Sequence, residues 1–377
     1  MADPVTVLYP FIEEAFSPET ADAVNEIRKI SAAGDVKPVV IVNRHGRTTE
    51  LLRKAHLAYY ELKAIHLIYP GDFYPVALYR LIFSSLPLFL FIKGQKIDVI
   101  HFYGIMPALL WTGAARMFRI PYVISLYNIE RYAKYASLTL ADASRLTCPS
   151  EMVMERLPNK YRFRAEVVPP AVSVPFIPEK QLEKRRRQWL TERGLPEKAL
   201  LMAAETDQSV DNLFILGEKL ASDLKTPIVF VTGTEGEPVT VGRVTVFPAA
   251  PDGFDEALPQ SRFFLGLDGR RATSSGTMKA MLAGVPAAAV DEGVYPEIIK
   301  NGKTGILFPF SDPGKWASRL AEALSSPEKT AETAATAKTE MDKTVRDIIA
   351  RRQESYRSPH PKKSSTAGVG LLNDEGE

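Results

Sequence analysis

The 377-residue chain has few of the residues that build disulfides and metal centres. It contains one cysteine, Cys148, and five scattered histidines. A single cysteine excludes an internal disulfide and a thiolate-rich metal site, and no two histidines have the close spacing of a zinc-binding pair. The sequence therefore predicts no metal and no other cofactor, and it is typical of a protein from a reducing, cytoplasmic compartment.

A strong charge imbalance and a long apolar run are also missing. Lys and Arg number 47 against 45 Asp and Glu, and the formal net charge of +2 gives no reason to expect nucleic acid as a partner. The N-terminus lacks a basic region followed by an apolar core, so we expect no signal peptide. The most apolar segment, residues 76–94, has no uninterrupted run near the ~20 residues that span a bilayer.

Segment 76–94 has two interpretations. The simpler one is a buried helix packed on a sheet. The alternative is a helix that docks on a protein partner or makes peripheral contact with a membrane. The docking candidates are then Arg80, Leu86, Leu88, Phe89 and Phe91.

Short β-branched or apolar runs alternate with helical stretches in two series along the chain. The first series of predicted strands comprises residues 5–10, 37–43, 97–104, 122–128, 145–150 and 164–170. The second comprises residues 199–205, 226–233, 243–249, 261–268, 284–290 and 304–310. This alternation predicts an α/β protein of two doubly wound, Rossmann-like domains with parallel sheets. A ligand is expected in the cleft beyond the carboxyl ends of the strands.

The length and the composition suggest where these domains begin and end. We expect an N-terminal domain over residues 1–172 and a C-terminal domain over residues 199–330. Residues 173–198 are rich in proline and charge, which predicts a linker. A C-terminal helix is expected over 331–357, followed by a disordered tail over 358–377.

Residues 270–286 read as a loop and the start of an apolar helix, and their ionic side chains are all cationic. No Asp or Glu occurs between Asp268 and Asp291. A helix start offers free N–H groups and partial positive charge, so this stretch predicts a seat for a phosphate, sugar-phosphate or nucleotide-sugar. Basic residues on a solvated loop explain the composition equally well. The candidate donor-site or anion-binding residues are Arg270, Arg271, Ser274, Ser275, Gly276, Thr277 and Lys279.

Two stretches carry a family resemblance. "DVIHFYGIMPALLWTGAARMFRIPYVISLY" (98–127) and "KAMLAGVPAAAVDEGVYPEIIKNGKTGILFPFSDPGKWASRLAEALSSPE" (279–328) resemble segments of the retaining family 4, or group 1, glycosyltransferases. The resemblance implies the GT-B fold, in which two Rossmann-like domains face each other and the last helix crosses back to the N-terminal one. It makes the N-terminal domain the acceptor side. The acceptor-side candidates are His101, Tyr103, Tyr127 and Asn128.

The resemblance fails at the donor site. The family has two glutamates, separated by seven residues, that hold the sugar and ribose hydroxyls; Arg271 and Lys279 stand at these positions. A cation cannot accept a hydrogen bond from a hydroxyl, so it does not replace a carboxylate in this role. Glu205 stands near the position of the arginine that neutralises the donor diphosphate, which would repel it.

These departures lead to a hypothesis with two alternatives. We expect a glycosyltransferase-like protein with a degenerate nucleotide-sugar site that acts by binding or scaffolding with a protein partner, as an accessory subunit rather than an enzyme. The first alternative is an active retaining hexosyl transferase to a glycan, lipid or protein acceptor, with non-standard donor contacts. Lys279 then parallels the lysine near the phosphate site of the α-glucan phosphorylases. The second is glycan binding by cleft tyrosines such as Tyr103, Tyr127 and Tyr132.

Overall fold

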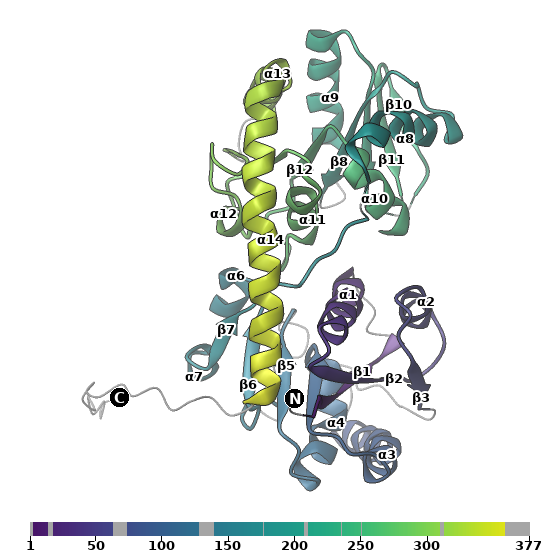
Figure 1. Ribbon diagram of the computed structural model, residues 1–377, viewed down its shortest axis with the longest axis vertical. Coiled ribbons are helices and arrows are strands. Elements are labelled where there is room, and N and C mark those ends of the chain that lie inside the picture. The colour runs from purple at the N-terminus through teal and green to yellow at the C-terminus, as the bar shows by residue number, and fades with distance from the viewer. Residues whose placement is uncertain are drawn as a thin grey trace, which may run out of the picture.

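The computed structural model describes residues 3–13, 18–62, 74–127, 139–175, 177–206, 210–234, 236–249, 251–309 and 313–358. They form two α/β domains, one above the other in Figure 1, and the long helix α14 runs along both. Asn128, Tyr132 and the expected tail beyond Ser358 lie outside the described residues.

The N-terminal sheet has seven parallel strands in the order β3-β2-β1-β4-β5-β6-β7. They are β1 (Val5–Phe11), β2 (Val36–Val42), β3 (Tyr59–Glu61), β4 (Val99–Tyr103), β5 (Tyr122–Ser125), β6 (Arg145–Cys148) and β7 (Ala165–Val167). The direction of winding reverses between β1 and β4, which opens a crevice at the carboxyl ends of these strands. Six of the strands match the predicted series, and the three-residue edge strand β3 is an addition.

Helices cover both faces of this sheet. They are α1 (Pro18–Ala32), α2 (Arg47–Lys54), α3 (Tyr74–Lys93), α4 (Ile105–Met117), α6 (Glu151–Glu155) and α7 (Asn159–Arg162). On one face α1 buries Ile27 and Ile30, while on the other α3 and α4 bury Leu88 and Trp111. The predicted layering of helices on both faces is confirmed.

The C-terminal sheet has the order β10-β11-β9-β8-β12-β13-β14. Its strands are β8 (Leu200–Glu205), β9 (Ile228–Thr232), β10 (Val239–Val241), β11 (Val244–Pro248), β12 (Phe263–Gly266), β13 (Ala287–Val290) and β14 (Ile306–Phe308). All pairs are parallel except β10 with β11, an antiparallel edge that the sequence did not predict. The winding reverses between β8 and β12, so the crevice of this domain lies there.

The helices of the C-terminal domain include one within the expected linker. They are α8 (Glu179–Glu192), α9 (Asp211–Leu224), α10 (Pro251–Ala257), a 3₁₀ turn (Leu258–Gln260), α11 (Ser275–Ala283), α12 (Tyr295–Ile298) and α13 (Pro313–Ser325). Helix α8 packs Trp189 and Leu190 into the C-terminal core. Residues 173–198 are thus not merely a connection, because two apolar side chains in a charged stretch suffice to anchor a helix.

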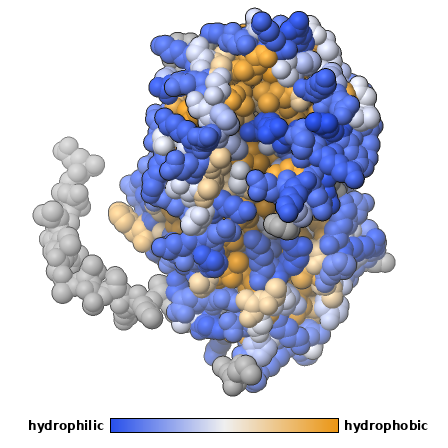
Figure 2. All heavy atoms as spheres, turned by 45° about the horizontal axis from the view of Figure 1, so that its top comes forward, coloured by the Kyte–Doolittle hydropathy of each residue, from blue (hydrophilic) through white to orange (hydrophobic). Residues whose placement is uncertain are grey.

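Helix α14 (Pro327–Arg357) joins the two domains. Its Ala337 and Met341 pack into the C-terminal core, and Tyr356 packs into the N-terminal core. Figure 2 shows a largely hydrophilic face with hydrophobic residues gathered in its hollows. Among the described helices, none combines the length and the apolarity needed to cross a bilayer.

Candidate functional site

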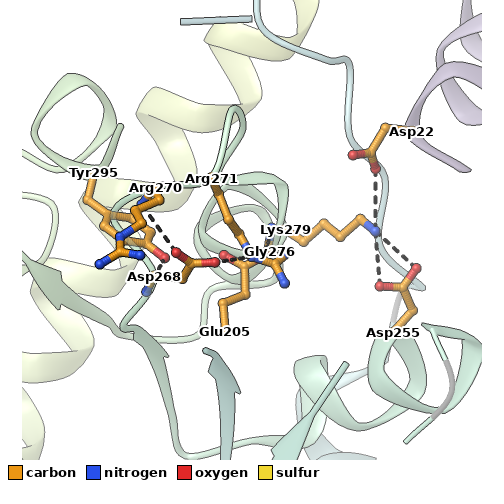
Figure 3. Close-up of polar contacts among 9 residues, drawn as sticks. All are labelled: Asp22, Glu205, Asp255, Asp268, Arg270, Arg271, Gly276, Lys279 and Tyr295. Atoms are coloured by element: carbon orange, nitrogen blue, oxygen red, sulfur yellow. Dashed lines mark hydrogen bonds and ion pairs between the residues drawn. The ribbon is translucent and has the colours of Figure 1, made fainter. Parts of the chain in front are cut away.

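The start of α11 lies at the reversal point of the C-terminal sheet, against the last residue of β8. The N–H of Gly276 donates to Glu205 Oε1 at 3.0 Å, and both residues are buried (Figure 3). A Cβ atom at position 276 would lie 2.4 Å from that oxygen, so a larger residue there would displace the carboxylate. The protein's own carboxylate therefore accepts a hydrogen bond at the helix start that the sequence predicts as an anion seat.

Arginine 271 neutralises the carboxylates around this helix start. Its Nε lies 3.2 Å from Asp268 Oδ2, and its Nη1 lies 3.8 Å from Glu205 Oε1. The N–H of Arg270 donates to the other oxygen of Asp268. Burial raises the pKa of Glu205, while Arg271 and the N–H of Gly276 act against that rise. The cation at the position of the family's first glutamate is thus paired internally.

Lysine 279 is enclosed between the two domains. Its Nζ lies 3.0 Å and 3.1 Å from the two carboxylate oxygens of Asp255 and 3.5 Å from Asp22 Oδ1 on α1 (Figure 3). Burial alone lowers the pKa of Lys279, but Asp22 and Asp255 outweigh it and raise that pKa above its ordinary value. The cation at the position of the second glutamate therefore bridges two carboxylates from opposite domains.

The hydroxyl residues of the predicted seat are mostly enclosed. Ser274 and Thr277 are buried, and neither side-chain oxygen has a hydrogen-bond partner among the described residues. Ser275, the first residue of α11, is half-buried. Of the predicted residues at this helix start, Arg271, Gly276 and Lys279 contact the protein's own carboxylates.

Two further helix starts carry carboxylates that sequence reasoning did not single out. Glu13 accepts from the N–H groups of Arg47 and Thr48 at the start of α2, at 2.5 Å and 3.0 Å. Glu297, on α12, accepts from the N–H groups at the start of α6, at 2.9 Å and 3.2 Å, and so links the two domains. The only sequence signal was the position of Glu297 in the "YPEII" part of the family-like stretch.

The acceptor-side candidates lie in a buried network. The ring nitrogens of His101 lie 2.7 Å from Tyr356 Oη and 2.8 Å from Ser125 Oγ. Burial and the nearby Arg352 lower the pKa of His101, which favours the neutral ring. His101 therefore ties α14 to β4 and β5, and its side chain is fully buried rather than exposed to a cleft.

A buried ion pair completes this network. Arg352 Nε on α14 lies 2.9 Å from Glu26 Oε1 on α1, and Tyr103 donates to the same oxygen at 2.8 Å. The ring of Tyr127 stacks 6.4 Å from that of Tyr103. Glu26 and Arg352 were missed because nothing in their local sequence signals a pair between helices so distant in the chain.

An open hollow of about 780 Å³ lies beside the enclosed helix start. It sits at the carboxyl ends of β8, β9, β11 and β12. Its ionic lining residues are Glu237, Asp268, Arg270 and Arg271. Within the described part of the chain, no cluster of three or more His, Cys, Asp or Glu side chains is placed to hold a metal ion.

The predicted docking residues of α3 fall into two groups. Leu88 is fully buried in the core, which corrects its assignment as a docking residue. Phe89 and Phe91 are half-buried against the rings of Phe118 and Tyr60. Leu86 is 52% exposed, whereas the side chain of Arg80 lies outside the described part of the structure.

Two family models match the chain, one in each domain. Residues 25–174 match Glycosyltransferase Family 4, and residues 277–340 match Glycosyl transferases group 1. A comparison with curated proteins gives no match.

Solved structures share the fold over almost the whole chain. The HepE protein of Anabaena in complex with UDP and glucose is 14% identical with a TM-score of 0.70, covering 94% of this chain and 100% of HepE. A glycosyltransferase from Rickettsia africae is 14% identical with a TM-score of 0.72, covering 95% and 99%. Sucrose-phosphate synthase from Thermosynechococcus elongatus is 12% identical with a TM-score of 0.67, covering 94% and 99%. The chain therefore carries a family 4-like and a group 1 glycosyltransferase domain, arranged in the GT-B fold.

Proposed function

We propose that this chain is a glycosyltransferase-like protein whose nucleotide-sugar site is degenerate, and that it acts by binding a protein partner as an accessory subunit. The observation that carries the proposal is the 3.0 Å hydrogen bond from the N–H of Gly276 to Glu205. A donor phosphate would need the N–H groups of this helix start, and the buried carboxylate of Glu205 already accepts from one of them.

Electrostatics supports the proposal. Transfer from a nucleotide-sugar requires stabilisation of the diphosphate that leaves. Two like charges about 4 Å apart repel by about 4 kcal/mol at an effective dielectric of 20. A phosphate beside Glu205 would meet this repulsion, and Arg271 is already shared with Asp268.

Hydrogen-bond chemistry supports it independently. Sugar and ribose hydroxyls need acceptors, and the ammonium and guanidinium groups of Lys279 and Arg271 have none to offer. Lys279 is 7% exposed and already bonded to Asp255, so a ribose could reach it only by breaking a buried ion pair.

An active transferase with non-standard donor contacts is the second candidate. The hollow of about 780 Å³ favours it, because Arg270 and Arg271 line it outside the enclosed helix start. HepE, which shares the fold of this chain, has been crystallised with UDP and with UDP-glucose.

The release of nucleoside diphosphate separates the two candidates. The intact protein is incubated with UDP-, GDP- and ADP-sugars, with and without simple glycan acceptors, and released diphosphate is measured. We expect release no faster than in buffer. Release by the intact protein that falls in Arg271→Ala but not in Lys300→Ala, on the exposed surface, would overturn the proposal.

A gain-of-binding variant tests whether Glu205 is what keeps phosphate from this helix start. Glu205→Ala frees the N–H of Gly276, and we expect it to bind inorganic phosphate at least tenfold more tightly than the intact protein. Glu237→Ala, which changes a carboxylate in the open hollow, should leave phosphate binding unchanged. Equal phosphate binding by Glu205→Ala and the intact protein contradicts the assignment of Glu205 as the internal anion.

A further inference from the structure

A groove between the two domains lies apart from the site described above. Its volume is about 560 Å³, and its lining comes from α1 of the N-terminal domain, from α8 and α11 of the C-terminal domain, and from α14. Leu282 and Ala283 line it at the end of α11, whereas Glu205 accepts from Gly276 at the start. The nine residues of α11 span about 13 Å. This interdomain groove also shares no described lining residue with the hollow of about 780 Å³.

The lining of the interdomain groove is largely aliphatic. Its buried or half-buried apolar side chains include Val174, Ile177, Leu182, Leu282, Val345 and Ile349. Among the described lining residues none is aromatic, so the groove offers no ring on which a base or a sugar could stack. An unbranched apolar chain suits this lining, because contact with it removes aliphatic surface from water.

Three cations also line the groove, against one carboxylate. The cations are Lys29 on α1 and Lys338 and Arg346 on α14, and the carboxylate belongs to Asp342. The three α14 residues follow one another at intervals of four, which places them on one face of the helix. Neither Lys338 nor Arg346 forms an ion pair within the part of the chain that the structure describes.

Lysine 29 is the least exposed of these cations. Its Nζ donates to the carbonyl oxygen of Val172, between β7 and α8, at 2.5 Å. That bond uses one of the three N–H donors of the ammonium group. Burial and the neighbouring Arg28 lower the pKa of Lys29, while Asp342 acts against that fall. A bound anion would also act against it, because an opposite charge favours the ammonium form.

The charges around the groove leave a positive excess. Arg28 adds a further cation beside Lys29. The carboxyl ends of α1 and α11 contribute partial negative charges of about half a unit each, which together with Asp342 do not cancel the four cations. A ligand that complements this groove therefore carries an anionic group.

We propose that the interdomain groove binds a single-chain amphiphile, with its apolar chain along the aliphatic lining and its carboxylate or phosphate group beside Lys29, Lys338 and Arg346. Lysine attracts such an anion as a point charge, and the N–H groups of arginine match its oxygens in pairs. Because the lining comes from both domains, the bound ligand contacts both and should raise the melting temperature. This binding needs no property of the nucleotide-sugar site, so it is tested separately from the accessory role.

Titration calorimetry of the full chain tests the proposal, with each amphiphile kept below its micelle concentration. Decyl phosphate and decanoate should bind saturably, and the tighter of the two identifies the preferred anionic group. Decanol keeps the chain without the charge, and inorganic phosphate keeps the charge without the chain. Both should bind at least about tenfold more weakly than decyl phosphate.

Matched double variants test the contribution of the cations. Lys338→Gln/Arg346→Gln removes two exposed cations from the groove and should weaken the binding of decyl phosphate at least about tenfold. Lys343→Gln/Arg351→Gln removes two exposed cations with the same spacing from α14 outside the groove, and it should weaken that binding less than about twofold.

A pair of neighbouring alanines tests the position of the chain. Ala32, the exposed last residue of α1, lines the groove, so Ala32→Trp should obstruct it and weaken binding. Ala33→Trp, exposed but outside the lining, should bind decyl phosphate like the intact protein. Circular dichroism should show that all these variants remain folded, because each position is exposed.

Several results would overturn the proposal. They are the absence of saturable binding of either anion, equal weakening by the two double variants, and binding of decanol as tight as that of decyl phosphate. A loss of decyl phosphate binding in Arg271→Ala would also overturn it, because the ligand would then lie in the open hollow. Binding to anionic vesicles without binding of the single-chain probes would replace it with a membrane surface.

Discussion

Replacement of Lys279 by methionine tests the enclosed ion cluster. The change keeps most of the side-chain volume but removes the ammonium group that Asp22 and Asp255 share. Removal of one partner from a buried ion pair costs about 3–5 kcal/mol, because the remaining charge stays in the protein interior.

The burial of the two carboxylates sets the expected size. The side chain of Asp22 is 2% exposed and cannot regain water in the folded protein, whereas that of Asp255 is 33% exposed and can do so in part. We therefore expect Lys279→Met to lower the free energy of unfolding by about 3 kcal/mol, at the lower end of the range.

Guanidinium denaturation of matched variants measures this loss. Lys300→Met removes a cation that lies 2.7 Å from Glu340 but is 63% exposed, and it should cost no more than about 1 kcal/mol. The double variant Asp22→Asn/Lys279→Met should recover at least about 1 kcal/mol relative to Lys279→Met, because no uncompensated Asp22 remains. Equal losses for Lys279→Met and Lys300→Met would refute the reasoning.

Three other predictions follow from buried contacts. Because the pKa of Glu205 is raised in the folded protein, its contribution to stability is full below the unfolded-state pKa of 4.5 and is lost as pH rises through the folded-state pKa. Thermal melts should therefore show Glu205→Gln gaining stability relative to the intact protein from pH 4 to 7. Gly266→Ala should cost about 1–3 kcal/mol in denaturation, because its Cβ would lie 2.5 Å from a buried tyrosine ring, whereas Gly113→Ala, in an exposed helical position with open space, should gain about 0.5–1 kcal/mol. Tyr356→Phe should lower the free energy of unfolding by about 1–3 kcal/mol, because it leaves one buried nitrogen of His101 unpaired. An unchanged melting temperature in Gly266→Ala or in Tyr356→Phe would contradict the packing described.

The sequence predicted the sheets well and the small elements poorly. All twelve predicted strands are present, because buried parallel strands are continuous apolar runs that the pattern detects. The edge strands β3 and β10 were missed, since three exposed or half-exposed residues carry no such pattern. The packing of helix α8 was not predicted, because its charged residues outnumber Trp189 and Leu190, on which that packing depends.

The sequence indicated residues that lie near one another in the structure, but it did not indicate how they are paired. The sequence indicated that cations replace the family's glutamates, and that Glu205 falls near a phosphate position. It could not indicate that Lys279 is held by Asp22 of the other domain, because such a contact depends on how the domains meet. The same reason hid the pair of Glu26 with Arg352.

Titration calorimetry of the intact chain with UDP-glucose tests the central claim most directly. We predict no saturable heat at ligand concentrations up to about 1 mM, where binding would be worth only about −4 kcal/mol. The variant Glu205→Ala, with the N–H of Gly276 freed, should show measurable binding under the same conditions. Micromolar binding by the intact chain that Glu205→Ala does not strengthen would contradict the proposal that the protein's own carboxylate holds the donor-phosphate position.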